Sequence, residues 1–150
     1  MKDLGFGTLH TLRAHGVVSD LASGGGAAFT IFSGTSARPR GSRTALAHDC
    51  PRLCTLEAVK HGLSRLHAEC VAGDRIMVET AWGSQLPFLG KNARGNKTAT
   101  VLVKTISDLL FALRSAGVEV RFSGQPSEPD PELVRQASRA LMTQRQTAMA

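Results

Sequence analysis

The chain has 150 residues, of which 42% are hydrophobic and 20% are charged. This composition fits one globular domain with its own core and excludes an intrinsically disordered chain. The formal net charge of +6 favours association with a polyanion such as nucleic acid, although a charge count by itself locates no site.

No apolar run approaches the roughly 20 residues that a membrane span needs, and the first residues lack the long apolar segment of a secretory presequence. Three cysteines, an odd number, provide no disulfide framework. We therefore expect an intracellular protein in a reducing compartment, with no membrane partner. The sequence does not distinguish cytoplasm, nucleus and organelle matrix.

The cysteines at 50, 54 and 70, together with His67, are residue types that bind zinc. Their spacing, C-x3-C and then H-x2-C, matches no common zinc motif. Small apolar side chains around a buried helix explain them better, so we predict no metal site there.

The first third of the chain predicts three strands. Residues 1–10 are expected to form a short extended or frayed extension. Apolar runs over 11–16 and 27–32 flank Gly24-Gly25-Gly26, which is typical of a hairpin. A third strand is expected over 44–48.

A polar loop is expected between the second and third strands, over residues 33–43. It contains the densest basic cluster of the chain, Arg38, Arg40 and Arg43. This cluster either contacts a phosphate backbone or is simply a solvated loop.

Helical spacing of apolar residues predicts a helix over 54–68, with one buried stripe. The stripe consists of Leu56, Val59, Leu63 and Leu66. Gly62 weakens this helix unless another element packs closely against it. A strand over 75–82 follows, whose run of three apolar residues suits burial on both faces.

A second helix is expected from about Thr100, with Gly117 placed to end it. Its apolar face would hold Val103, Ile106, Leu109, Leu110 and Leu113. The alternation in 118–122 predicts a half-buried strand. A second basic loop is expected over 91–97, with Lys91, Arg94 and Lys97.

The last helix has strong start signals. Asp130 suits the N-cap, Pro131 the first helical position and Glu132 the positive helix end. Arg135 and Arg139 lie one turn apart on this helix, and residues 144–150 are expected to fray.

The resulting order, β-β-β-α-β-α-β-α, predicts an α/β fold with a single mixed five-stranded sheet flanked by helices. This order and several local strings resemble ribonuclease H, most closely the domains of ingi-type non-LTR retrotransposons. The similarity covers roughly residues 11–142, and a domain over 11–143 is expected. The strings are Ala14-His15-Gly16-Val17, Gly24-Gly25-Gly26-Ala27, Glu57-Ala58-Val59, Thr80-Ala81-Trp82 and the segment from Gly124 to Arg135.

The resemblance implies a phosphodiester hydrolase that holds two divalent cations, commonly Mg²⁺, between carboxylates. At the four carboxylate positions this chain has His15, Glu57, Ala81 and Arg135, and Gln125 replaces the loop histidine. One acid of four remains, so loss of nuclease activity is expected and no cofactor is predicted.

Two consequences of the missing acids can be tested. Glu79 is the best substitute ligand, because it lies two residues from Ala81 and so faces the same side of its strand. Glu57 is expected to have a structural role, in an ion pair with Arg135 or His15.

The sequence leaves three functions open. The first is a retroelement-derived, nuclease-dead domain that binds RNA, RNA–DNA hybrid or a ribonucleoprotein. Its candidate contacts are Arg38, Arg40, Arg43, Lys91, Arg94, Lys97, Arg135 and Arg139. The second is a protein–protein scaffold in a large assembly. The third is an active RNA–DNA hybrid ribonuclease with relocated ligands, which alone would need Mg²⁺.

Overall fold

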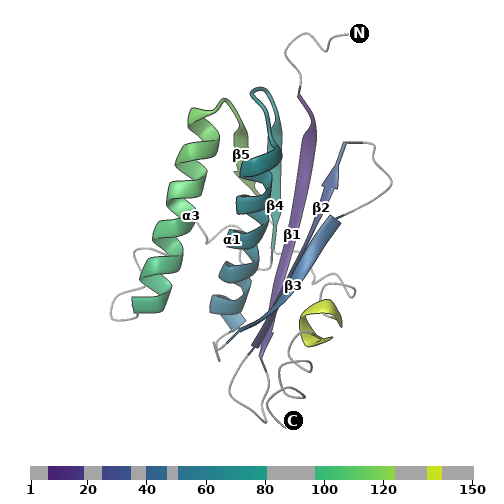
Figure 1. Cartoon of the computed structure of the whole chain (residues 1–150), viewed down its shortest axis with the longest axis vertical. Coiled ribbons are helices and arrows are strands. Elements are labelled where there is room, and N and C mark those ends of the chain that lie inside the picture. The colour runs from purple at the N-terminus through teal and green to yellow at the C-terminus, as the bar shows by residue number, and fades with distance from the viewer. Residues whose placement is uncertain are drawn as a thin grey trace.

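A mixed sheet with strand order β3-β2-β1-β4-β5 forms the centre of the fold (Figure 1). The computed structural model describes residues 7–18, 25–34, 40–46, 51–80, 97–123 and 135–139. The strands are β1 (Leu9–Val18), β2 (Gly25–Ser33), β3 (Arg40–Leu46), β4 (Arg75–Glu79) and β5 (Glu119–Phe122). β1, β2 and β3 form an antiparallel meander, whereas β4 pairs in parallel with β1 and with β5. The predicted five-stranded mixed sheet is confirmed.

Two long helices, α1 (Pro51–Glu69) and α3 (Lys97–Ser115), lie side by side on one face of the sheet (Figure 1). A short helical stretch over 135–139 lies on the opposite face. Its Ala137, which is fully buried, packs against Ala28 of β2. The sheet is therefore covered on both faces near β1 and β2.

Side chains of β1 alternate between these two faces, as the pleat requires. Leu12, Ala14 and Gly16 are buried beneath α1, whereas Arg13 and His15 point to the other face and are partly exposed. β1 therefore contributes an apolar row to the core and a polar row to the opposite side.

The core lies between α1 and the sheet. All four residues of the predicted α1 stripe are buried, and they pack with residues such as Leu12, Ile76 and Val78. Gly62 is buried in α1, where an added Cβ would lie 2.8 Å from Cδ2 of Leu12. The expected reason for a glycine in this helix, close packing against another element, is confirmed.

The end of α3 also follows the sequence prediction. Gly117 has a φ of 86°, in the left-handed region that glycine adopts without strain. The N–H of Gly117 donates to the carbonyl of Arg114, and the N–H of Val118 donates to that of Leu113. This pair of bonds is a Schellman motif, which satisfies carbonyls at the helix end.

Several element boundaries differ from the prediction. β1 begins at Leu9, so the expected extension over 1–10 already contains strand residues. β3 spans Arg40–Leu46 and not 44–48, which places Arg40 and Arg43 in a strand and not in a loop. The reason is that an edge strand is hydrogen-bonded on one side only and tolerates charged residues.

The two long helices begin earlier than predicted. α1 starts at Pro51, because proline fits the first helical position, where no N–H partner is needed. α3 starts at Lys97, so this lysine lies in a helix and not in the expected loop. Within the described ranges, no helix has both the length and the apolar character needed to cross a lipid bilayer.

Candidate functional site

Three of the five positions that the sequence resemblance matches to ribonuclease H catalytic residues belong to elements that meet at one end of the sheet. His15 lies near the end of β1, and the neighbouring Gly16 lies against Cys54 and Thr55 at the start of α1. Glu57 follows in the next turn of that helix. The helical stretch 135–139, which carries Arg135, packs on Ala28, and Ala28 is the register partner of His15 in β2. Ala81 and Gln125 lie outside the described residues.

Glu57 is 9% exposed and is in contact with a lysine and a histidine of its own helix. Its Oε2 lies 2.9 Å from Nζ of Lys60 and 3.3 Å from Nε2 of His61. A carboxylate held in this way is already partly neutralised. The predicted pairing with Arg135 stays a prediction.

His15 is more than half buried, and this burial lowers the pKa of its imidazole below the ordinary value of 6.5. An ion pair with Glu57 would raise that pKa instead, because a nearby carboxylate favours the charged ring. The predicted pairing of His15 with Glu57 stays a prediction. His15 contributes a neutral ring to this end of the sheet.

Glu79, the predicted substitute ligand, is also engaged by a cation. It is the register partner of Arg13, and its Oε2 lies 3.6 Å from Nε of Arg13. The Arg13 guanidinium also lies 5.1 Å from the centroid of the Phe32 ring, within cation–π range. Glu79 thus has a structural partner on the face that also carries His15.

These side chains do not fit a pair of Mg²⁺ ions. Mg²⁺ prefers several oxygen ligands in near-octahedral geometry. Among the described residues at this end of the sheet, the available side-chain groups are the imidazole of His15, the carboxylates of Glu57 and Glu79, each with a cationic partner, and the guanidinium of Arg135. The side chain of Ala81 offers no ligand atom. Among described residues, the metal-ligand types that gather within reach of one ion lie elsewhere.

Basic positions converge on the same end of the sheet. Arg43 of β3 is the register partner of Ala28, which pairs on its other side with His15. The three residues therefore form one row across the sheet. Arg135 and Arg139 are exposed on the helical stretch that packs over this row. The candidate contacts Arg38, Lys91 and Arg94 lie outside the described residues.

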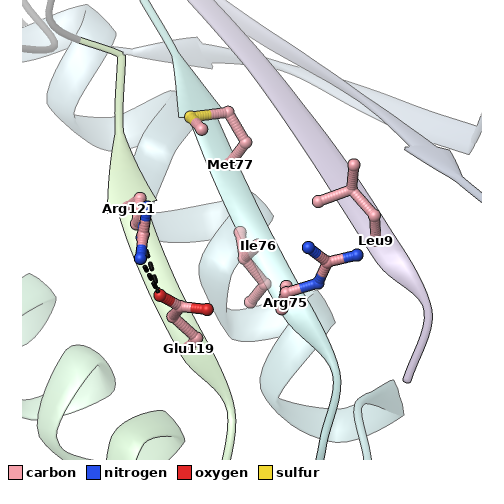
Figure 2. A pocket seen from close by; sticks show the side chains of 6 residues that line it. All are labelled: Leu9, Arg75, Ile76, Met77, Glu119 and Arg121. Atoms are coloured by element: carbon pink, nitrogen blue, oxygen red, sulfur yellow. Dashed lines mark hydrogen bonds and ion pairs between the residues drawn. The ribbon is translucent and has the colours of Figure 1, made fainter. Parts of the chain in front are cut away.

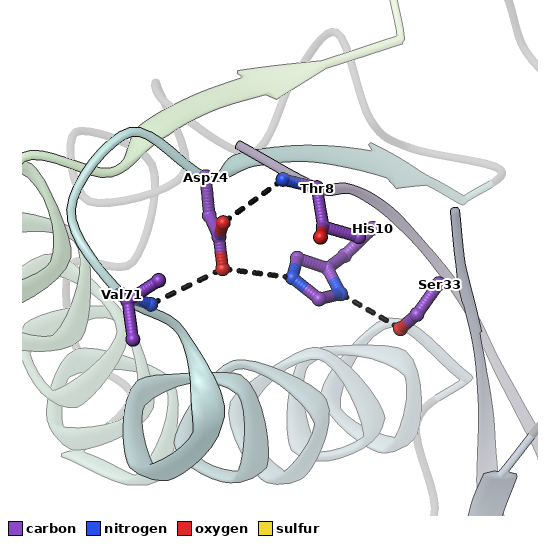
Figure 3. A network of polar contacts seen from close by, with 5 residues as sticks. All are labelled: Thr8, His10, Ser33, Val71 and Asp74. Atoms are coloured by element: carbon purple, nitrogen blue, oxygen red, sulfur yellow. Dashed lines mark hydrogen bonds and ion pairs between the residues drawn. The ribbon is translucent and has the colours of Figure 1, made fainter. Parts of the chain in front are cut away.

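The opposite end of β1 carries a buried polar cluster that the sequence prediction missed (Figure 3). We call it the His10–Asp74 clasp, formed by Thr8, His10, Ser33, Val71 and Asp74. His10 Nδ1 lies 2.7 Å from Oγ of Ser33, and His10 Nε2 lies 3.1 Å from Oδ2 of Asp74.

Backbone donors complete the clasp. The N–H of Thr8 donates to Oδ1 of Asp74 at 2.9 Å, and the N–H of Val71 donates to Oδ2 at 3.1 Å. Burial by itself would raise the pKa of the Asp74 carboxyl, but the hydrogen bonds from Val71, His10 and Thr8 outweigh it and hold the pKa below its ordinary value. No sequence signal identified the pair, because His10 and Asp74 are 64 residues apart.

A shallow hollow lies on the face of β1, β4 and β5 that points away from α1 (Figure 2). Its lining consists of Leu9, Arg75, Ile76, Met77, Glu119 and Arg121. Nε of Arg121 donates to Oε1 of Glu119 at 2.6 Å, so one of the two arginines is paired with a carboxylate. Arg75 is an exposed cation that the sequence prediction did not select.

The zinc site considered from the sequence is excluded by helix geometry. Cys54 lies in the first turn of α1 and Cys70 directly after its last residue. Sixteen residues at about 1.5 Å per residue separate them by about 24 Å. One metal ion cannot contact both thiols, and Cys50 lies outside the described residues.

Comparison with known proteins finds similar structures but no similar sequence. No family model matches the chain, and no curated protein matches its sequence. Solved ribonuclease H domains do match the structure. The N-terminal ribonuclease H domain of Rv2228c from Mycobacterium tuberculosis is 12% identical with a TM-score of 0.72, over 95% of this chain and 99% of that one.

Two further ribonuclease H structures are similar to this chain. Ribonuclease H1 from the archaeon Halobacterium salinarum is 10% identical with a TM-score of 0.65, over 90% of this chain and 98% of that one. LC11-RNase H1, solved with an RNA/DNA hybrid, is 11% identical with a TM-score of 0.61, over 90% and 98%. At these identities the likeness shows the fold alone. The chain has a ribonuclease H-like fold, as expected.

Proposed function

We propose that this ribonuclease H-like domain binds RNA or RNA–DNA hybrid without cleaving it. The observation that carries the proposal is the row Arg43, Ala28 and His15, with Arg135 and Arg139 on the helix above it. Arg135 and Arg139 are exposed cations at this end of the sheet, and the carboxylates described there, Glu57 and Glu79, each have a cationic partner. Such a surface attracts phosphate, and its described side chains offer few ligands for metal-assisted hydrolysis.

The fold neighbours support the choice of partner. One of them was solved with an RNA/DNA hybrid, so a domain of this shape can accommodate such a duplex. The net charge of +6 adds a general attraction to polyanions. With six Phe, one Trp and no Tyr in the chain, stacking on bases contributes little, and recognition depends on phosphates and duplex shape. A retroelement origin belongs to the same proposal and rests on the motif strings.

Fluorescence anisotropy with a labelled RNA–DNA hybrid tests the binding. The paired substitutions Arg135→Ala and Arg139→Ala should weaken binding at low salt by about tenfold and reduce the salt slope by about 2, roughly 1 for each lost cation. The matched control is Arg65→Ala with Lys104→Ala, which removes two exposed cations from α1 and α3. The control should change affinity less than about twofold, apart from general electrostatics.

Two results would overturn the proposal. Absence of low-salt binding by the folded wild-type chain would favour the protein–protein scaffold. Cleavage of the hybrid with Mg²⁺ or Mn²⁺ would instead favour the active ribonuclease with relocated ligands.

A further inference from the structure

The His10–Asp74 clasp lies beside a third side chain that can bind a metal. The ligand atoms of His10, Cys70 and Asp74 all lie within 4.8 Å of one another. They come from two segments: His10 from β1, and Cys70 and Asp74 from the two ends of the short connection between α1 and β4. We propose that these three side chains form a zinc-binding site, at the end of β1 opposite to His15.

The geometry suits a tetrahedral ion. Two ligands that bind Zn²⁺ at about 2.0 Å stand about 3.3 Å apart, and His10 Nε2 already lies 3.1 Å from Oδ2 of Asp74. His10 is 7% exposed and Asp74 5% exposed, so both side chains are fixed by their surroundings. Cys70 is half-buried, and its Sγ lies within 4.8 Å of the ligand atoms of His10 and Asp74. Three protein ligands leave one position for water.

Ser33 has the position of a supporting hydrogen-bond partner. A histidine that binds zinc through Nε2 donates its Nδ1–H to an acceptor, which fixes the tautomer and the ring orientation. Oγ of Ser33 lies 2.7 Å from His10 Nδ1 and can fill this role. Because a hydroxyl both donates and accepts, Ser33 also suits the metal-free state, in which it donates to Nδ1 while Nε2–H donates to Asp74.

Zinc binding therefore replaces the proton on Nε2 of His10. The ion takes the place of the Nε2 proton between His10 and Asp74, the neutral ring carries its proton on Nδ1, and the Cys70 thiol releases its proton to solvent. Both carboxylate oxygens of Asp74 keep their backbone donors, Thr8 and Val71. The site also follows the C-terminal end of α1, where the helix dipole favours a cation.

The test uses the full chain and Co²⁺ as a spectroscopic probe for Zn²⁺. One equivalent of Co²⁺ should give tetrahedral d–d absorption with a thiolate-to-cobalt band, and Zn²⁺ should displace both. Cys70→Ser should remove the thiolate band and weaken Zn²⁺ binding more than about tenfold, and Ser33→Ala should weaken it about 10-fold or more. Cys54→Ala and Cys50→Ser are the matched cysteine controls and should keep the band.

Protein stability provides a second measurement. Zn²⁺ should raise the Tm of the wild-type chain by linkage, and at the same Zn²⁺ concentration it should raise that of Cys70→Ser by clearly less. Cys70→Ser and Ser33→Ala both keep the contact of His10 with Asp74, so the chain should stay folded in both variants. The proposal is overturned if the folded wild-type chain binds no stoichiometric Co²⁺ or Zn²⁺. It is equally overturned if Cys70→Ser binds them as the wild type does.

Discussion

Gly16 of β1 lies directly against Cys54 of α1. A Cβ added to Gly16 would overlap Cβ of Cys54 and would lie 2.5 Å from the backbone nitrogen of Thr55. No side-chain rotation relieves a contact with backbone. The absence of a side chain at Gly16 therefore allows α1 to approach the strand beside His15, and it sets the position of Glu57 relative to the sheet.

Gly16→Ala should therefore destabilise the fold by about 1–3 kcal/mol, the usual cost of overpacking a core. Gly62→Ala is the matched comparison, since its added Cβ would meet the side-chain tip of Leu12 and alanine favours the helix by about 1 kcal/mol. It should cost clearly less. Urea unfolding of both variants measures the difference, and equal losses would contradict this account of Gly16.

Replacement of Asp74 should show what the clasp contributes to stability. Asp74→Ala leaves the buried His10 without its partner, at about 1–3 kcal/mol for an unpaired buried group, and also removes the acceptor of the Thr8 and Val71 N–H groups. Asp108→Ala removes an exposed pair with Lys104 and should cost at most about 1 kcal/mol. Both changes are measured by denaturant unfolding without added metal. A loss no larger in Asp74→Ala than in Asp108→Ala would show that the clasp is dispensable.

The burial of His15 predicts a pH dependence of stability. Because the folded-state pKa is below 6.5, the unfolded chain binds the proton first as the pH falls through 6.5. The free energy of unfolding should therefore decrease below that pH, with a slope under the limit of about 1.4 kcal/mol per pH unit for one proton. The charged groups on the same sheet face, Arg13 and Glu79, are already paired with each other.

His15→Gln should flatten this slope between about pH 6.5 and 5, since glutamine does not titrate. The wild-type chain, measured in parallel, is the control. Urea midpoints at several pH values provide the measurement. An unchanged slope in His15→Gln would refute the assignment to His15.

Glu57→Gln should leave hybrid binding unchanged or slightly tighter. The substitution keeps the shape of the side chain and removes a negative charge near the proposed phosphate-binding end. Loss of its ion pair with Lys60 and of its contact with His61 should cost roughly 1 kcal/mol, because both partners are partly exposed. Anisotropy and thermal unfolding of the same preparation separate the two effects. Much weaker binding by a stable variant would instead indicate a direct role for this acid.

Much of the fold was predictable from the sequence, because the signals are local. The α1 stripe, the glycine end of α3 and the alternation in β5 each depend on spacing within one element. The start of β3 was missed because Arg40 and Arg43 resemble a solvated loop. Only the pairing with β2 explains a strand there, and that pairing is not visible in the local sequence.

In the candidate sites too, residues with a local sequence signal were predicted and residues brought together by long-range pairing were not. Glu57 and His15 were selected through motif strings, and the structure brings their elements to one end of the sheet. The clasp was missed because Asp74 follows a glycine and reads as a turn residue. His10 lies in a segment that was expected to fray. Its partner is set by the β1–β4 register, which a linear motif does not encode.

The contact between Thr8 and Asp74 spans 66 residues of chain, whereas the β1–β2–β3 meander joins neighbours in sequence. Bringing Thr8 and Asp74 together closes a longer loop, which costs more chain entropy before any stabilising contact forms. We therefore expect the meander to assemble early and β4 to dock later, with the clasp among the last contacts made. In amide hydrogen exchange, the two edges of β1 should then differ: N–H groups bonded to β4 should exchange through openings that leave the hairpin with β2 intact.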